Sequence, residues 1–261
     1  MPEIKRLFYD LETSPNIMFS WRAGYKINLD HDNIIKERAI ICVCYKWENS
    51  PKIYSMQWNN GDDRQLVEDF AFVANEADEL VAHNGDRFDI RWFNGRNLMH
   101  DMPPIPEYKT VDTCSIAKRK FALNSYRLDY LAKILLGEGK IKTEFSMWKD
   151  ICLHNDPNAM KKMVKYCKRD VALLQRVWEY LKPYYTPKTH EGVLNGDGRW
   201  SCPGCGADDI ILSKTRATPM GMPRYQMQCK ECGRYFTVSS LVYRQFLEIK
   251  ASQEAVEGVA Q

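Results

Sequence analysis

The chain has 261 residues, of which 44% are hydrophobic and 12% aromatic, and its formal net charge is +3. These values are typical of a globular protein with a sizeable core, and they exclude a long disordered or low-complexity chain. No apolar stretch approaches the length of a membrane span, and the first residues lead directly into a strand-like segment. We therefore expect an intracellular protein, cytoplasmic or nucleoid-associated and not secreted, with no membrane partner.

The first predicted elements are strands. Residues 4–10 form an apolar-rich strand, and residues 39–47 and 52–58 follow as two more, which together predict a three-stranded meander. Residues 62–75 have the apolar spacing of an amphipathic helix, which leads into a short apolar strand at residues 79–83.

The second half of this region is mainly helical. A helix is predicted over residues 88–99, a short strand over 109–111, and helices from residue 113 to about residue 181. Strands followed by interleaved helices predict an α/β fold, in which a mixed sheet is flanked by helices.

Changes in composition divide the chain. Prolines and glycines between residues 183 and 198 mark a linker, and closely spaced cysteines follow it. We therefore predict a first domain over residues 1–184, a linker over 185–198, a small cysteine-containing domain over 199–240, and a short helix with a frayed tail over 241–261.

Acidic residues in three separate segments are the candidates for chemistry. Asp10 and Glu12 alternate at the end of the first strand, so both carboxylates lie on one face and could share a hard divalent cation. Asp89 lies in the first turn of a helix, and Tyr166 and Asp170 lie four residues apart on one helix face. Each segment also has an ordinary explanation: surface acids at a strand end, an acid that suits a helix N-terminus, and a packed Tyr beside a solvated Asp.

Two further acids in these regions are read as helix caps. Asp86 could cap the helix that carries Asp89, and Asp112 precedes the helix that begins at Thr113. An Asp immediately before a helix accepts hydrogen bonds from the first free backbone N–H groups. We therefore assign no chemistry to either residue.

Taken together, the three segments resemble a known family. Asp10-x-Glu12, Asn84-x-x-x-Phe88-Asp89 and Tyr166-x-x-x-Asp170, in this order, are similar to the three exonuclease motifs of the DEDD superfamily, in the variant with Tyr called DEDDy. The middle motif most resembles that of the proofreading exonuclease domain of family B DNA polymerases. The resemblance covers roughly residues 4–182 and implies a ribonuclease-H-like fold of the DnaQ-like kind.

The resemblance implies a 3′-to-5′ exonuclease that hydrolyses the phosphodiester bonds of DNA with two magnesium or manganese ions. Asp10 would contact both ions, Glu12 and Asp170 the ion on the nucleophile side, and Asp89 the second ion through waters. Tyr166 would orient the attacking water, because a tyrosine with a pKa near 10 is a poor base at neutral pH.

Two residues of the middle motif match family positions near the substrate. Asn84 and Phe88 would contact the terminal nucleotide, although Phe88 fits a helix-packing role equally well. Lysines and arginines around the expected cleft, among them Lys118, could follow a phosphate backbone or simply form a solvated face.

Two Cys-x-x-Cys pairs near the C-terminus predict a metal site. Cys202-Pro-Gly-Cys205 and Cys229-Lys-Glu-Cys232 supply four thiolates, which suit one tetrahedral structural zinc ion. A disulfide within a Cys-x-x-Cys pair is strained, so the zinc ribbon is the favoured interpretation.

The predicted ribbon also offers candidate contacts to partners. Its cations could bind phosphates, and its aromatic residues either stack on unpaired bases or form the small core that a ribbon needs. The cations are Lys214, Arg216 and Arg224, and the aromatic residues are Trp200, Tyr225, Tyr235 and Phe236. DNA is the expected partner and RNA stays open, while replication or repair proteins are further candidates because such ribbons also bind proteins.

Two rival functions fit the same sequence. One is a catalytically silent adaptor that only grips a nucleic-acid end, and metal-dependent release of nucleotides would exclude it. The other is a structure-specific endonuclease or a ribonuclease, because one fold supports several modes of cleavage. Cutting of a circular single strand would favour the endonuclease.

Overall fold

The computed structural model describes residues 4–22, 24, 27–139 and 144–259, with side chains as far as residue 252. Lys5–Leu181 form one compact unit, and Lys182–Gln261 form the main part of a second. Within the described part of the chain, none of the helices combines the length and the apolar composition that crossing a membrane requires.

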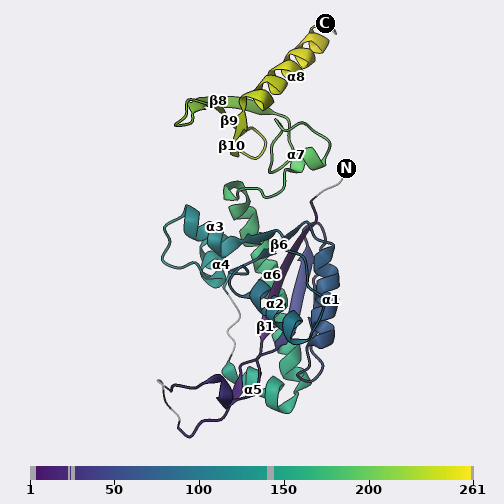
Figure 1. The fold of residues 1–261 in the computed structure, drawn as a ribbon, viewed down its shortest axis with the longest axis vertical. Coiled ribbons are helices and arrows are strands. Elements are labelled where there is room, and N and C mark those ends of the chain that lie inside the picture. The colour runs from purple at the N-terminus through teal and green to yellow at the C-terminus, as the bar shows by residue number, and fades with distance from the viewer. Residues whose placement is uncertain (1–3, 23, 25–26, 140–143, 260–261) are drawn as a thin grey trace. The chain divides into compact units, whose positions relative to one another are not determined.

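The first unit is built on a five-stranded mixed sheet with the strand order β5-β4-β1-β6-β7. The central strand β1 (Arg6–Thr13) pairs antiparallel with β4 (Ile40–Trp47), which pairs antiparallel with β5 (Tyr54–Gln57). On its other side β1 runs parallel to β6 (Glu79–Ala82), and β6 runs parallel to β7 (Thr110–Asp112). The predicted meander and the predicted mixed sheet are therefore confirmed (Figure 1).

Helices cover both faces of this sheet. On one face, α1 (Arg64–Asn75) and α2 (Asp89–Met99) pack on a core that includes Leu7 and Tyr9 of β1. The other face of β1 and β4 lies against α6 (Pro157–Leu181), the longest helix of the unit. Because side chains alternate along a strand, residues of β1 with even numbers face α6 and those with odd numbers face α1 and α2.

The remaining helices of the unit surround α6. They are α3 (Thr113–Lys120), α4 (Leu128–Leu136) and α5 (Phe145–His154), and all three contact α6. A small hairpin of β2 (Ile17–Met18) and β3 (Ile34–Lys36), the latter preceded by the 3-10 turn η1 (His31–Asn33), follows β1. The sequence pattern did not predict this hairpin, because its strands are only two and three residues long.

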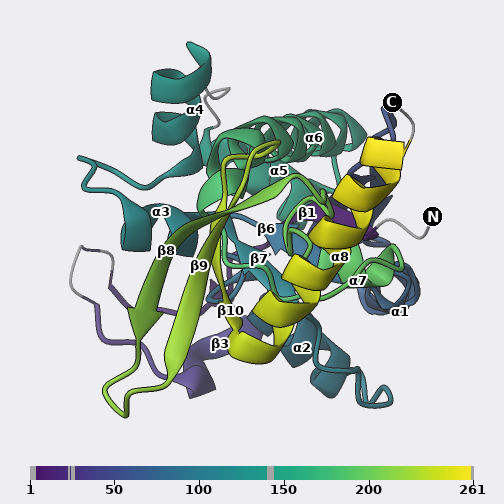
Figure 2. The ribbon, with the colours of Figure 1, turned by 90° about the horizontal axis from the view of Figure 1, so that it is seen from above.

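The second unit contains a three-stranded antiparallel sheet with the order β10-β9-β8. Its strands are β8 (Ile210–Ala217), β9 (Pro223–Cys229) and β10 (Tyr235–Ser239), and α8 (Ser240–Val259) follows directly. Figure 2 shows β8 and β9 as a long ribbon with β10 and α8 beside it. β8 and β9 form a hairpin, and α8 is longer than the short helix predicted after the cysteine-containing domain.

The segment predicted as a linker also has structure. The 3-10 turn η2 (Lys182–Tyr184) precedes it, and α7 (Glu191–Leu194) lies within it. Gly192 of α7 is buried, and a Cβ atom on it would come within 1.9 Å of the Ser201 hydroxyl. The Arg234 side chain donates hydrogen bonds to the carbonyl oxygens of Tyr185 and Lys182. This segment is therefore packed against the cysteine-containing part of its own unit.

Candidate active site

The two acids of β1 lie on the face of the sheet that α6 covers. Asp10 pairs with Cys44 of β4 and Glu12 pairs with Cys42, whereas the intervening Leu11 is buried in the opposite core. Both acids are partly exposed. Asp10 and Glu12 therefore lie on the same face of the strand, as their period-two spacing predicts.

Helix α6 is joined to β1 at the level of these acids. The Cys167 thiol lies 3.3 Å from the backbone oxygen of Asp10, to which it donates a hydrogen bond. Asp170 follows one turn later on α6 and is only 3% exposed. Ligand oxygens of Asp10, Glu12 and Asp170 all lie within 4.8 Å of one another. The fold thus brings together acids that are far apart in the chain.

This group of acids suits a hard divalent cation. Carboxylates held this close repel one another when they are ionised, and a cation removes the repulsion while using the oxygen ligands that magnesium and manganese prefer. Tyr166 lies four residues before Asp170 on α6 and is half-buried, so it occupies the neighbouring position on the same side of the helix.

Asp89 approaches β1 from the edge of the strand. β1 pairs with β6 only as far as Phe8 and Val81, so Leu11 lies beyond the last paired residues of these two strands. One carboxylate oxygen of Asp89 accepts a hydrogen bond from the Leu11 N–H group at 3.1 Å. Asp89 therefore lies beside the residue that separates the two strand acids, although the three-acid group does not include it.

The surroundings of Asp89 favour its neutral form. Burial raises the pKa of Asp89 to about 7, although the hydrogen bond from Leu11 acts in the opposite direction and the charge of Asp112 adds to the rise. A nearby cation would favour the ionised form instead. Asp89 is the first residue of α2, and Phe88 holds the N-cap position, so the suggestion that Asp86 caps this helix is wrong.

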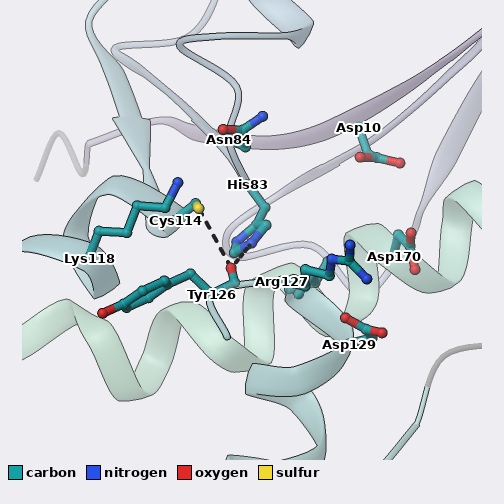
Figure 3. Close-up of a pocket in the computed structure, with 10 residues that line it drawn as sticks. Asp10, His83, Asn84, Cys114, Lys118, Tyr126, Arg127, Asp129 and Asp170 are labelled. Carbon is teal, nitrogen blue, oxygen red and sulfur yellow. Dashed lines mark hydrogen bonds between the residues drawn. The ribbon is translucent and has the colours of Figure 1, made fainter. Parts of the chain in front are cut away.

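A cavity of about 500 Å³ opens beside the acids. It is lined by residues of five segments: β1, the turn after β6, α3, the start of α4, and α6. Figure 3 shows the lining residues, which are Asp10, His83, Asn84, Cys114, Lys118, Tyr126, Arg127, Leu128, Asp129 and Asp170. Two of the four carboxylates of the predicted site and the predicted substrate residue Asn84 therefore border one cavity.

Hydrogen bonds hold the cavity wall formed by the start of α3 and the loop before α4. His83 contacts the backbone oxygen of Tyr126 through Nε2 at 2.8 Å and the hydroxyl of Thr113 through Nδ1 at 2.9 Å. Because a carbonyl oxygen only accepts, His83 Nε2 carries a proton. The Cys114 thiol donates to the same oxygen of Tyr126 at 3.5 Å. The sequence pattern gave His83 no role, because Tyr126, which it contacts, is 43 residues away in the chain.

The turn that carries Asn84 is fixed by a buried acid. Asn84 has a φ of 65°, a left-handed conformation that Asn tolerates better than most residues. Its N–H group donates to Asp112 at 2.9 Å, and the same carboxylate accepts from the Ser115 N–H group at 3.1 Å. The predicted capping role of Asp112 is thus confirmed, and one side chain also ties together the ends of β6 and β7.

Phe88 lies close to this turn but packs into the protein. Its ring is 6.4 Å from that of Trp92, and it lies against the core beneath α1 and α2. Phe88 is not among the described residues that line the cavity. Contact between Phe88 and a nucleotide therefore stays a prediction, and helix packing accounts for its position.

A second group of acids lies elsewhere in this unit and is already neutralised. Asp63 is fully buried and accepts hydrogen bonds from Arg96 at 2.6 and 2.8 Å, from His100 at 2.6 Å and from the Ile40 N–H group at 2.7 Å. Burial acts to raise the pKa of Asp63, but these hydrogen bonds outweigh it and hold that pKa below its ordinary value. This group serves the structure, because Arg96 occupies the place that a cation would take.

We expect Asp63→Asn to lower the free energy of unfolding at pH 7 by about 3–5 kcal/mol, because it leaves Arg96 buried without a counter-charge. The folded-state pKa of Asp63 lies below its unfolded value of about 3.9, so its stabilisation is present above that pH and is lost as the pH falls through the folded-state pKa. Urea unfolding at pH 7 and pH 3 measures the difference, which should shrink in acid. The exposed neighbour Asp62→Asn is the control, and an equal loss in both variants would contradict the assignment.

The second unit brings its four cysteine sulfurs together. Cys202 and Cys232 have sulfurs 3.7 Å apart, those of Cys205 and Cys229 are 3.6 Å apart, and all four lie within 4.8 Å of one another. Tetrahedral zinc with Zn–S bonds of about 2.3 Å requires sulfurs about 3.8 Å apart. The four side chains therefore fit a closed tetrahedral metal site.

Comparison with known proteins agrees with this fold. Residues 31–182, more than half of the chain, match the model of the RNase H superfamily. The chain therefore belongs to the RNase H superfamily, whose fold is a nuclease fold. The match begins after β1, the strand that carries Asp10 and Glu12, and it includes the other four strands of the sheet and α6 with Asp170.

Two DNA polymerases are similar to parts of the chain. A DNA polymerase of Methanocaldococcus jannaschii is 22% identical in an alignment of 209 residues, and the alignment covers 70% of this chain and 12% of that protein. The family B DNA polymerase of the hyperthermophilic archaeon Pyrobaculum calidifontis has a TM-score of 0.55 and 17% identity, over 70% of this chain and 25% of that chain. The chain thus corresponds to a minor part of the length of either polymerase.

Proposed function

We propose that the chain is a 3′-to-5′ exonuclease of the DEDDy type that hydrolyses the phosphodiester bonds of DNA. The observation that carries this proposal is the convergence of Asp10, Glu12 and Asp170 within 4.8 Å. The cavity beside them, at about 500 Å³, has a volume in the range of small-ligand sites and suits a terminal nucleotide. The similarity to DNA polymerases supports DNA over RNA.

The acids have separate roles in this proposal. Two magnesium or manganese ions, when bound, activate a water for attack and stabilise the leaving oxygen. Asp10 would be a ligand of both ions, Glu12 and Asp170 of the ion on the nucleophile side, and Asp89 of the second through water. Ligation of an ion by Asp89 would require its ionised form, and the charge of the ion would lower the pKa that burial has raised.

Cations on the cavity wall would hold the substrate strand. Lys118 of α3 and Arg127 at the start of α4 line the cavity together with Asn84. Among the described residues, neither cation has an ion pair with a carboxylate of the protein. Their charges are therefore available to phosphates of a bound strand, while Asn84 offers an amide to the terminal nucleotide.

The test is digestion of single-stranded oligonucleotides labelled at the 5′ end, in DNA and RNA forms, with and without magnesium. A descending ladder from the 3′ end that requires magnesium is the expected result, with DNA degraded faster. Loss of the label as a mononucleotide would indicate the opposite polarity. Cleavage of circular single strands would point to an endonuclease, and binding without cleavage to an adaptor.

Tyr166→Phe should lower kcat on the order of 10–100-fold, because the hydroxyl would no longer orient the attacking water. The magnesium concentration for half-maximal rate should stay the same, since the hydroxyl is not a proposed metal ligand. Steady-state kinetics over a magnesium titration measure both quantities. Tyr130→Phe, a half-buried tyrosine of α4, is the matched control. An unchanged kcat in Tyr166→Phe would remove this residue from the mechanism.

We further propose that Cys202, Cys205, Cys229 and Cys232 hold one structural zinc ion and that the second unit is a zinc ribbon. The sulfur spacing supports a closed four-thiolate shell, which leaves no ligand position for a substrate. We also propose that residues 1–184 form the catalytic domain and residues 199–240 form the ribbon.

A further inference from the structure

The two faces of the three-stranded sheet in the second unit differ sharply. On the inner face, Tyr225 of β9 stacks on Tyr243 of α8 with ring centroids 4.0 Å apart. Met227 and Val238 are buried on the same face, in a cluster with Trp200 and Phe246. The inner face is therefore the core of this unit, and the outer face is the one that α8 leaves open.

The register of the strands identifies the outer face. Lys214 is opposite Gln226, Arg216 is opposite Arg224, and the alternating residues of β10 complete the rows. Cross-strand partners share a face. The outer face consists of Ile211, Lys214, Arg216, Arg224, Gln226, Gln228, Tyr235, Thr237 and Ser239. It thus carries three cations, amides and hydroxyls, and among these described residues there is no carboxylate.

Two of the cations on this face are close enough to repel each other. Arg216 and Arg224 are direct cross-strand partners, and like charges in that position destabilise a sheet. Lys214, Arg216 and Arg224 are all exposed, and within the described residues none of the three has a counter-charge on the protein. An arrangement that costs stability and lacks internal compensation is suited to an anionic partner.

The structure also decides which aromatic residue can reach a partner. Trp200 is 9% exposed, Tyr225 is stacked on α8, and Phe236 is half-buried in the core cluster. Tyr235 is 54% exposed on the outer face, next to Gln228 in the register. Trp200, Tyr225 and Phe236 therefore form part of the core of this unit. The Tyr235 ring is the one that can contact a base.

We propose that this outer face binds single-stranded nucleic acid, with Lys214, Arg216 and Arg224 on consecutive phosphates and Tyr235 stacked on an unpaired base. Charge complementarity selects the phosphate backbone, because the face offers cations without acids. An exposed aromatic ring at the end of a row of polar side chains selects an unpaired base, since bases in a duplex present no free face. This binding is independent of the nuclease chemistry proposed for the first unit.

The test measures binding without cleavage. The full-length protein with Asp10→Ala is titrated into a 5′-fluorescein oligothymidylate, its RNA counterpart and a DNA duplex, and anisotropy is followed from 50 to 300 mM salt without chelator. The triple variant with Lys214, Arg216 and Arg224 changed to Gln should bind single strands at least ~10-fold more weakly, and its slope of log affinity against log salt should fall by about 2. Tyr235→Leu should weaken single-strand binding about tenfold, whereas Tyr235→Phe should retain it.

The control removes the same charge from the same unit at other exposed positions. Lys188, Arg199 and Arg244 changed to Gln should leave both the affinity and the salt slope close to those of the parent, and zinc content should be equal in all variants. Equal losses in the two triple variants would overturn the proposal. Tighter binding of the duplex would overturn the assignment to single strands. Unaltered DNA binding when the outer face is neutralised would overturn the proposal and leave the face to a protein partner.

Discussion

Asp10→Asn is expected to lower the metal-dependent rate of cleavage on the order of 10³-fold or more. The substitution keeps the shape of the side chain but removes the charge that Asp10 shares with Glu12 and Asp170 within 4.8 Å. With fewer carboxylates, the site would hold its cations weakly and out of position. Initial rates on a 5′-labelled single-stranded oligonucleotide, with magnesium varied up to saturation, measure the effect.

Asp129→Asn is the matched control for this prediction. Asp129 lines the same cavity from α4 but is not one of the three clustered acids. It should change the rate by only a few-fold and leave the magnesium dependence as it is. Similar losses in both variants would show that charge in the cavity matters in general, and full activity of Asp10→Asn would remove the acid group from the mechanism.

Cys229→Ser should abolish zinc binding and unfold the second unit while the first unit stays folded. The core of the second unit is small, and a structural zinc site in a domain of this kind contributes on the order of 10 kcal/mol to folding. Loss of one of four thiolates removes most of that contribution. Zinc content by mass spectrometry should fall from one ion per chain to nearly none, and limited proteolysis should cleave the region after residue 182.

Cys152→Ser tests whether any cysteine would give the same result. Cys152 is half-buried on α5 and is not one of the four clustered cysteines. It should keep one zinc ion per chain and the protease resistance of the second unit. A zinc content that survives Cys229→Ser, with the unit still folded, would show that the four thiols stabilise the unit without a metal.

The strand acids and the order of the elements could be predicted from local pattern. Alternation alone places Asp10 and Glu12 on one face, and apolar spacing identifies β4, α1 and α6. Local pattern does not say which helix covers which face of a sheet, so the meeting of Asp170 with the strand acids was predicted only through the family motifs. The hydrogen bond from the Cys167 thiol to the Asp10 carbonyl oxygen links α6 to β1. It depends on the packing of distant segments, which a short stretch of sequence does not reveal.

Other features escaped prediction for related reasons. The hydrogen bond from Leu11 to Asp89 arises because β6 is shorter than β1, and strand lengths are poorly defined by sequence. Arg127 reaches the cavity from the loop around Tyr126, and the position of this loop depends on tertiary contacts such as the hydrogen bond between His83 and the Tyr126 carbonyl oxygen.

The bond between Cys167 and the Asp10 carbonyl spans 157 positions of the chain. During synthesis, β1 leaves the ribosome before α6, which follows only after nearly all of the first unit has been translated. Until then, Asp10 and Glu12 lack Asp170, and the group of acids is incomplete. Premature termination anywhere before Asp170 therefore yields fragments that lack the full set of carboxylates. The order of translation delays the assembly of the acid group until α6 is available to cover the sheet.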